Sequence, residues 1–407
     1  MNRFFCYLLI SFISFAFVGN TYAKEVKGDI YPDKTLTLYK KKAINIAMFL
    51  PLAYDKIEEL DFTKFNIEEK KRIKYRCFEY ITFYEGARIA LEKLEAEGYA
   101  VSLYVYDVGE DDINQMKTLL AQPELKKMDL IIPLVFQQSF ALVSEFSNAN
   151  KIPIINPMSS NYSVIENNPY TFKIQPSDIA DVETILRYIK NNFPNPNITL
   201  VFTPNEKNIV EMYQKGIEKE GWPWLGLDYN KYARRLFEKV DLSKDNIFIS
   251  VVDKGNYKLN EAYANTILSQ LNNKRNLPEV NLIAQYSWLD FPSIDLSLIQ
   301  KHNFHFTLSY LNDYTNANFA DFVKDYRHHF HQEPDKIYAA LGYDIMMFFV
   351  PALSQKGKKF IDEPNVDRSK FMINSFLFDR DDAKNGWQNR RTVVYKINDY
   401  KIISVGR

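Results

Sequence analysis

The chain has 407 residues, 46% of them hydrophobic and 25% charged, and its 51 basic side chains balance 51 acidic ones. This describes an ordinary globular protein long enough for two domains, and the low count of 13 glycines excludes collagen-like repeats and flexible glycine-rich linkers. A net charge of zero gives no electrostatic basis for binding nucleic acid or an anionic membrane surface.

The first 23 residues have the features of a secretory signal peptide. Arg3 supplies a positive start, Phe4 to Val18 form an apolar core, and Thr21 to Ala23 make an acceptable cleavage site. The apolar core is shorter than the ~20 residues that span a bilayer, so we expect cleavage rather than a membrane anchor. Of the two cysteines, only Cys77 would remain, and no intramolecular disulfide could then form.

Strand and helix patterns alternate along the first part of the chain. A polar lead (24–42) precedes a nearly continuous apolar run at 43–52, typical of a strand covered on both faces. After a charged insertion (55–74), the pattern predicts in order helix 75–98, strand 99–108, helix 111–122, strand 129–136, helix 139–150 and strand 152–157. This order with short loops predicts a parallel, doubly wound sheet.

A second series of the same kind begins after 168–178, where we expect the chain to cross between units. It predicts helix 179–193, strand 198–204, helix 206–221, strand 246–252, helix 257–273 and strand 280–287. A further apolar helix covers 338–353, and segments 375–382 and 390–406 are expected to form a closing hairpin. The sequence therefore predicts an α/β fold with two doubly wound parallel-sheet lobes.

Candidate site residues follow the predicted strands, because ligands of open parallel sheets bind at the carboxyl ends of the strands. The clusters at these positions are Pro51–Leu52, Phe136–Ser139, Asn156–Ser160, Thr203–Lys207, Asp253 and Tyr286–Asp290. Ser139 falls near an expected helix N-cap, after Gln137 and Gln138. It is either a plain cap, or part of a helix start whose free N–H groups bind a carboxylate or another anion. Asn156, Ser159 and Ser160 could meet the same ligand from the neighbouring loop.

Signatures of catalysis and of cofactor or metal binding do not stand out. The sequence contains no GxGxxG, Walker or GxSxG motif. Its five histidines lie in two groups, 302–305 and 328–331, without cysteine, and we expect the second group on a solvated helix end rather than in a metal site. The acidic run 379–382 lacks the glycine and glutamate of an EF-hand and is expected to be a turn. We therefore expect no enzyme, no cofactor and no metal.

Several phrases, in this order, resemble the type I periplasmic-binding-protein family, in the branch of leucine/isoleucine/valine-binding proteins. They are INIAMFLPL (44–52), YITFYEGARIALEKLEAEG (80–98), DLIIPLVF (129–136), FSNANKIPIINPMSS (146–160), NPYTFKIQPSD (168–178) and the segment 317–348. The resemblance covers residues 43–400. It is nearest to LysM-linked relatives from Bacteroidetes, although the chain shows no LysM repeat.

The resemblance implies two lobes joined by three crossovers, with a small ligand between them. The expected parts are a signal peptide (1–23), a polar lead (24–42), lobe one (43–172 and 309–375) and lobe two (173–308 and 376–407). In such proteins, loops corresponding to Gln137–Ser139 and Met158–Ser160 hold an amino-acid carboxylate. Lobe two supplies an aromatic and an acidic residue. Here Glu206–Lys207 stands at the aromatic position, and the loop expected to carry the acid reads QYSWLD (285–290).

The resulting candidate ligand-binding residues are Gln137, Gln138, Ser139, Asn156, Ser159, Ser160, Lys207, Asp253, Tyr286 and Asp290. The first functional hypothesis is a periplasmic solute-binding protein that holds an amino acid or short peptide for an ABC permease. The alternative is a cell-envelope scaffold of the same fold that acts on peptidoglycan or on cell-wall enzymes. In both cases the mature chain is expected to be periplasmic, without a membrane span.

Overall fold

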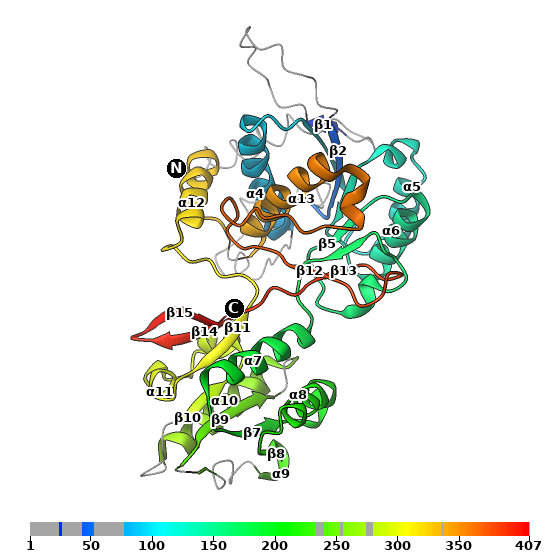
Figure 1. Ribbon diagram of the computed structural model, residues 1–407. Coiled ribbons are helices and arrows are strands. Elements are labelled where there is room, and N and C mark those ends of the chain that lie inside the picture. The colour runs from blue at the N-terminus through cyan, green and yellow to red at the C-terminus, as the bar shows by residue number, and fades with distance from the viewer. Residues whose placement is uncertain are drawn as a thin grey trace, which may run out of the picture. The chain divides into compact units, whose positions relative to one another are not determined.

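The computed structural model describes residues 24–26, 43–52, 77–232, 240–241, 243–252, 255–273, 280–335 and 337–406. The expected signal peptide lies outside the described residues. The chain divides into two compact units (Figure 1). The first unit holds the described residues up to Gln175 and Asn312–Asn389, and the second holds Pro176–Leu311 and Arg390 onward. The chain therefore passes three times from one unit to the other, which is the number of crossovers expected.

The sheet of the first unit has a parallel core. Its strands are β1 (Lys24–Val26), β2 (Ile44–Leu50), β3 (Val101–Asp107), β4 (Leu130–Pro133), β5 (Ile154–Asn156), β6 (Thr171–Lys173), β12 (Phe378–Asp379) and β13 (Trp387–Asn389). They lie in the order β1-β3-β2-β4-β5-β6-β13-β12. The pairs from β3 to β13 are parallel, whereas β1 and β12 are antiparallel additions at the two edges. The predicted doubly wound lobe is confirmed, with mixed edges.

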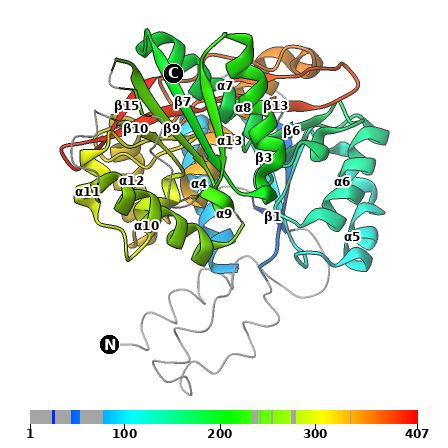
Figure 2. The same cartoon turned by 90° about the horizontal axis from the view of Figure 1, so that it is seen from below.

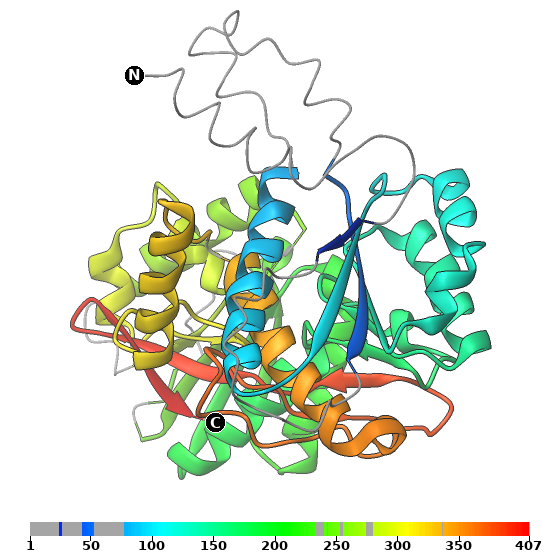
Figure 3. The same cartoon turned by 90° about the horizontal axis from the view of Figure 1, so that it is seen from above.

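Helices cover both faces of this sheet. They are α4 (Cys77–Ala96), α5 (Ile113–Leu120), α6 (Gln137–Asn150), α12 (Ala317–Phe330) and α13 (Tyr338–Lys356), with short 3-10 turns η1 (Pro123–Lys127), η2 (Tyr162–Ile165) and η5 (Gly357–Ile361). Along β2, Ile46 and Met48 pack with α4, α12 and α13, whereas Ala47 and Phe49 pack with α5 and α6. Figures 1 and 3 show α4 with α13 on one side of β2, and α5 with α6 on the other.

The α4–α13 contact is unusually close because glycines lie in it. A Cβ added to Gly342 of α13 would overlap the carbonyl of Phe83 in α4. Likewise, a Cβ on Gly86 of α4 would overlap the carbonyl of Ala339 in α13. The backbones of the two helices therefore touch, and α13, buried along most of its length, fills the centre of this layer.

The sheet of the second unit repeats the same winding. Its strands are β7 (Pro196–Phe202), β8 (Trp224–Asp228), β9 (Asp245–Val251), β10 (Val280–Ile283), β11 (His305–Leu308), β14 (Val393–Asn398) and β15 (Lys401–Gly406), in the order β15-β14-β11-β10-β9-β7-β8. In chain order the parallel strands run second-first-third-fourth-fifth in both units. The β14–β15 hairpin adds antiparallel strands at the β11 edge.

The helices of the second unit also lie in two layers. They are α7 (Asp178–Asn192), α8 (Lys207–Lys219), α9 (Tyr229–Tyr232), α10 (Tyr257–Asn273) and α11 (Leu296–Lys301), with 3-10 turns η3 (Pro204–Glu206) and η4 (Tyr286–Asp290). Helices α7 and α8 pack side by side on one face (Figures 1 and 2), and α10 and α11 share the core of the other. Among the described residues, no helix has the length and apolar character to cross a membrane.

One expected boundary is wrong. The sequence predicts that residues 376–407 belong as a whole to lobe two, and that 375–382 form a closing hairpin with 390–406. Instead β13 pairs in parallel with β6, and β12 pairs with β13, so both strands extend the first sheet. The chain enters the second unit only at Arg390. The hairpin that closes the chain is β14–β15, and its two strands lie entirely within 390–406.

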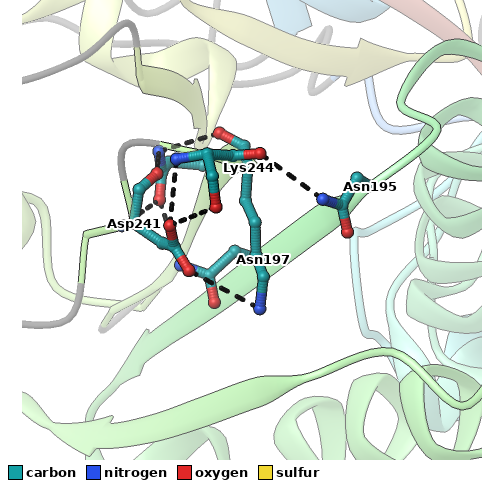
Figure 4. Close-up of polar contacts among 6 residues, drawn as sticks. Asn195, Asn197, Asp241 and Lys244 are labelled. Carbon is teal, nitrogen blue, oxygen red and sulfur yellow. Dashed lines mark hydrogen bonds and ion pairs between the residues drawn. The ribbon is translucent and has the colours of Figure 1, made fainter.

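A polar network fixes the edge of the second sheet at which the parallel strands begin (Figure 4). Asn246 of β9, only 1% exposed, donates to the carbonyls of Asp241 (2.8 Å) and Lys244 (3.1 Å). Its oxygen accepts from Asn197 of β7 (3.0 Å) and from the Asp241 N–H (2.9 Å). All four hydrogen-bonding positions of the amide are thus used in joining the starts of β7 and β9.

Replacing Asn246 with aspartate is expected to destabilise the second unit by about 3 kcal/mol, because a carboxylate would face two carbonyl oxygens with no proton to donate. Urea denaturation should show this as a lower midpoint. Ser243→Ala, in the same turn, removes one exposed hydrogen bond to Asp241 and should change stability by about 0.5 kcal/mol or less. Equal effects of the two changes would contradict a structural role for the buried amide.

Candidate functional site

The carboxyl edge of each sheet, where the parallel strands end, contains the point at which the winding reverses. In the first unit this point lies between β2 and β4, and in the second between β7 and β9. Loops from neighbouring strands turn away in opposite directions there and leave room for a ligand. The loops after these strands and after their neighbours β5 and β10 therefore carry the candidate ligand-binding residues.

The first candidate loop, Gln137–Ser139, is helical from its first residue. Helix α6 begins at Gln137, and its N-cap is Phe136, whose side chain makes no capping bond. The expectation that Ser139 is the N-cap is therefore wrong: it is the third residue of the helix and completely buried. Gln137 and Gln138 are exposed at the helix start, so they remain available to a solute.

The N-terminus of α6 already binds a carboxylate from the same chain. The Ser139 N–H donates to Oδ1 of Asp111 at 2.8 Å. Asp111 belongs to the loop after β3, which approaches α6 so closely that the Phe136 N–H donates to the Glu110 carbonyl at 2.7 Å. Asp111 is not among the residues predicted from the sequence, although the acidic run Glu110–Asp112 shortly after a strand was a signal for it.

Asn156, Ser159 and Ser160 form a turn after β5. The Asn156 side-chain oxygen accepts the N–H of Ser159 (2.8 Å), and the Ser159 hydroxyl accepts the N–H of Asn161 (3.1 Å). Asn156 is buried, whereas Ser160 is exposed. The side chains of Asn156 and Ser159 thus shape the loop, and Ser160 is the member of this set with a free approach from solvent.

Lys173 is a further buried residue that the sequence analysis did not select. It ends β6, is 0% exposed, and its Nζ donates to the carbonyls of Gln175 (2.5 Å) and Ser160 (3.2 Å). A buried ammonium is costly without such acceptors. Lys173 therefore holds the loop after β5 in place, and its signal in the sequence was a lysine between two apolar residues, Phe172 and Ile174.

In the second unit, the candidates Lys207, Tyr286 and Asp290 differ in their surroundings. Lys207 opens α8 with a side chain 79% exposed, 3.8 Å from Glu211. Tyr286 is half-buried beside Phe306, with ring centroids 5.2 Å apart, and burial raises the pKa of its hydroxyl. Asp290 is exposed at the end of η4. Asp253 lies outside the described residues.

A network of side-chain amides joins the loop that contains Tyr286 to helix α10. Asn260 of α10 donates to Oε1 of Gln285 at 2.6 Å and accepts from Nε1 of the fully buried Trp288 at 3.1 Å. Gln285 in turn donates to the Val252 carbonyl at 3.5 Å. The loops after β9 and β10 are therefore tied to α10 by amides. Asp290, at the end of this loop, makes none of these amide hydrogen bonds and stays exposed.

Two histidines of the second unit are buried and neutral. His305 of β11 lies 3.0 Å from the Tyr188 hydroxyl through Nε2. Burial, and the charges of Lys396 near His305 and Lys301 near His302, lower the pKa of each imidazole to about 4. By contrast, the group at 328–331 lies at the end of α12, where His328, His329 and His331 are exposed as expected.

Acidification from pH 7 to pH 5 is therefore expected to destabilise the second unit. Both folded-state pKa values lie below the ordinary value of ~6.5, so the stability that these histidines confer is present above pH 6.5 and is lost as the pH falls towards 4. The loss amounts to about 2 kcal/mol for each histidine by pH 5. Urea unfolding followed by tryptophan fluorescence should show it, and His305→Gln should reduce the dependence on pH. An unchanged dependence in that variant would rule out His305 as its source.

Metal ligands do not gather in the part of the chain that the structure describes. No group of three or more histidine, cysteine or carboxylate side chains there could hold a metal ion. The acidic run 379–382 begins with the last residue of β12 and leads into a turn, in which the Asn385 N–H donates to the Asp382 carbonyl at 3.0 Å. Asp381 accepts the Tyr162 hydroxyl, and this hydrogen bond lowers the pKa of its carboxyl.

No family model and no curated protein matches the sequence, but solved structures match the fold. A putative branched-chain amino acid ABC transporter protein from Rhodospirillum rubrum is 14% identical, with a TM-score of 0.62 over 89% of this chain and 100% of that one. An ABC transporter substrate-binding protein from Desulfitobacterium hafniense in complex with Leu is also 14% identical, with a TM-score of 0.54 over 89% and 100%.

A solute-binding protein from R. palustris in complex with 4-hydroxybenzoate is 13% identical, with a TM-score of 0.51 over 90% of this chain and 96% of that one. These structures match nearly the whole chain at low identity, so the likeness concerns architecture. Two α/β units of the same winding, joined by three chain crossings, complete the correspondence. The protein has the fold of the type I periplasmic binding proteins.

Proposed function

We propose that this protein is a solute-binding protein, which holds a small polar molecule of the amino-acid or short-peptide class at the carboxyl edges of its sheets. The observation that carries the proposal is the repeated doubly wound unit, whose strand order reverses at one point of each sheet. Exposed polar groups lie at these edges, among them Gln137 and Gln138 in the first unit and Asp290 in the second.

The fold neighbours support a role in binding rather than catalysis. A substrate-binding protein from D. hafniense and a solute-binding protein from R. palustris, both of ABC transporters, have this architecture and form complexes with Leu and 4-hydroxybenzoate. By analogy, the partner of this protein is an ABC permease. Ligand would then drive a change between two arrangements of the units through its greater affinity for one of them.

The proposed location is the periplasm. The first 23 residues carry the charge and apolar pattern of a cleavable signal. Expression with the natural N-terminus, followed by mass spectrometry of the periplasmic fraction, should give a chain that begins at Lys24. An intact N-terminus retained in the membrane fraction would contradict cleavage.

A thermal-shift screen of the mature chain against amino acids, short peptides and muropeptides tests the proposed function. A true solute at 100 times its Kd should stabilise the protein by about 2.7 kcal/mol. Gln138→Ala should weaken this response, since Gln138 is exposed at the start of α6. Gln355→Ala is a matched control: it removes an exposed glutamine from the far end of α13, where its side chain lies 3.5 Å from Tyr99, ahead of β3.

A flat response to all three classes would contradict solute binding and favour the envelope scaffold. A response that both glutamine variants retain would instead place the solute away from α6. If only muropeptides give a response, the protein binds a solute, but the solute is a cell-wall fragment.

A further inference from the structure

Helix α6 of the first unit carries an anion at its N-terminus, and the anion is part of the chain. The Ser139 N–H, in the first turn of this 14-residue helix, donates to the Asp111 carboxylate at 2.8 Å. The start of a helix combines unpaired N–H donors with the positive end of the dipole, which favours a carboxylate. Asp111 therefore occupies a position that suits the carboxylate of a free amino acid.

We propose that Asp111 is a built-in occupant of this anion site, which makes the wild-type protein exclude free carboxylates from the carboxyl edge of the first sheet. The solute class that follows rests on the proposed function: a solute would present an amine or a neutral polar group to this edge. An amino acid or peptide would thus be recognised here through groups other than its carboxylate.

The loop that carries Asp111 is held in place on both sides. The Phe136 N–H donates to the Glu110 carbonyl at 2.7 Å, which joins the loop to the start of α6. Gln115 of α5 accepts the Gly109 N–H at 2.6 Å and donates to the Asp107 carbonyl at 3.2 Å. Because the backbone on either side of Asp111 is fixed, its carboxylate is directed to Ser139 by the fold of the loop.

The negative charge of this loop also opposes the binding of a second anion. Three consecutive acidic residues follow Gly109, and each accepts hydrogen bonds from uncharged donors. Glu110 accepts the Tyr80 hydroxyl at 3.2 Å, Asp111 the Ser139 N–H, and Asp112 the N–H groups that begin α5. In the described part of the chain, no ion pair joins Glu110, Asp111 or Asp112 to a lysine or arginine. A second anion at this edge would be repelled, whereas an ammonium group would be attracted.

The same turn of the helix carries a hydroxyl that makes no hydrogen bond among the described residues. The Ser139 hydroxyl is fully buried and has no hydrogen-bond partner among the described residues. Buried hydroxyls are normally satisfied. A small carboxylate that replaced the Asp111 side chain would therefore meet the Ser139 N–H and a residue with an unused hydroxyl.

Chemical rescue tests the proposal with acetate as the probe and acetamide as its neutral isostere. Asp111→Ala should lower the Tm, and acetate at about five times its Kd should raise it again by about 2–4 °C. Acetamide should not, and the wild type should respond equally little to both. The Ser139 amide resonance in a ¹H–¹⁵N spectrum should shift with acetate in Asp111→Ala only.

Asp321→Ala is the charge-matched control, since it removes an exposed carboxylate from the middle of α12; it should show no rescue. If Asp111→Ala does not fold, Asp111→Asn keeps an oxygen for the Ser139 N–H and should show the same preference for acetate at higher concentration. A saturable wild-type response equal to that of the variants, or no preference for acetate over acetamide in them, would overturn the proposal. Acetate is not the proposed solute, so a failed solute screen leaves this result unaffected.

Discussion

Gly342→Ala is expected to destabilise the first unit by about 3 kcal/mol or more, the upper part of the range for overpacked cores. The added Cβ would overlap the Phe83 carbonyl oxygen and lie 3.2 Å from the Ala87 nitrogen, both in the backbone of α4. Backbone atoms within a helix cannot turn aside as a side chain can. The two helices would therefore have to separate, and the contacts of the buried helix α13 would loosen along its length.

Urea denaturation of the variant should show a lower midpoint with loss of the helical signal. Gly216→Ala is the matched control: its Cβ would meet the terminal methyl of Leu186 on α7, which can rotate away. Both substitutions gain about 1 kcal/mol of helix propensity, so the difference between them isolates the backbone overlap. Equal midpoints for the two variants would show that α4 and α13 do not need their close approach.

Asp344→Asn is expected to destabilise the first unit by about 2 kcal/mol near pH 6, and to remove a dependence of stability on pH. Asp344 of α13 is 1% exposed, and its two oxygens accept the N–H groups of Ile373 (2.7 Å) and Asn374 (2.8 Å). The protonated carboxyl keeps a lone pair on its hydroxyl oxygen and can still accept both N–H groups, whereas the NH2 group of an asparagine has no lone pair to offer and would face a donor. The segment 373–374 would lose its attachment to the helix.

The pH dependence follows from the burial of this carboxyl, which raises its pKa to about 8. The folded protein then holds a proton that the unfolded chain, with an ordinary aspartate pKa of ~3.9, has released. The resulting stability is fully present below pH 3.9 and is lost as the pH rises to 8, at up to about 1.4 kcal/mol per pH unit. Comparing wild type with Asp344→Asn at pH 6 and pH 8 checks this, and equal pH slopes would contradict it. The sign is opposite to that expected for His302 and His305.

Much of the architecture follows from local patterns. The apolar runs at 43–52, 129–136 and 280–287 each contain the strand that they predict, because a strand covered on both faces must be apolar throughout. The alternation with helices of 3.6-residue period fixes the doubly wound type, since parallel neighbours require crossover helices. Strands β8 and β13 are not distinguished from loops in the sequence, because so short a segment has no readable period unless it is apolar throughout.

The positions of the candidate site residues at the sheet edge could be predicted from the sequence, but their hydrogen-bond partners could not. That Gln137–Ser139 and Asn156–Ser160 lie at a carboxyl edge follows from strand order alone. That Asp111 bonds to Ser139, or that Lys173 supports Ser160, depends on which loops the sheet brings together. These partners are 28 and 13 residues apart, and no local pattern encodes such pairings.

By itself, the sequence determined the fold class, the two repeated units and the position of the candidate residues at the carboxyl ends of the strands, because these depend on hydrophobic period and element order. Only the tertiary structure decided that residues 378–389 complete the first sheet, since β13 finds its partner in β6 more than 200 residues earlier. It also decided that the N-terminus of α6 binds a carboxylate of the same chain, that of Asp111. A helix N-terminus favours any nearby carboxylate, and which one is nearest is a property of the folded chain.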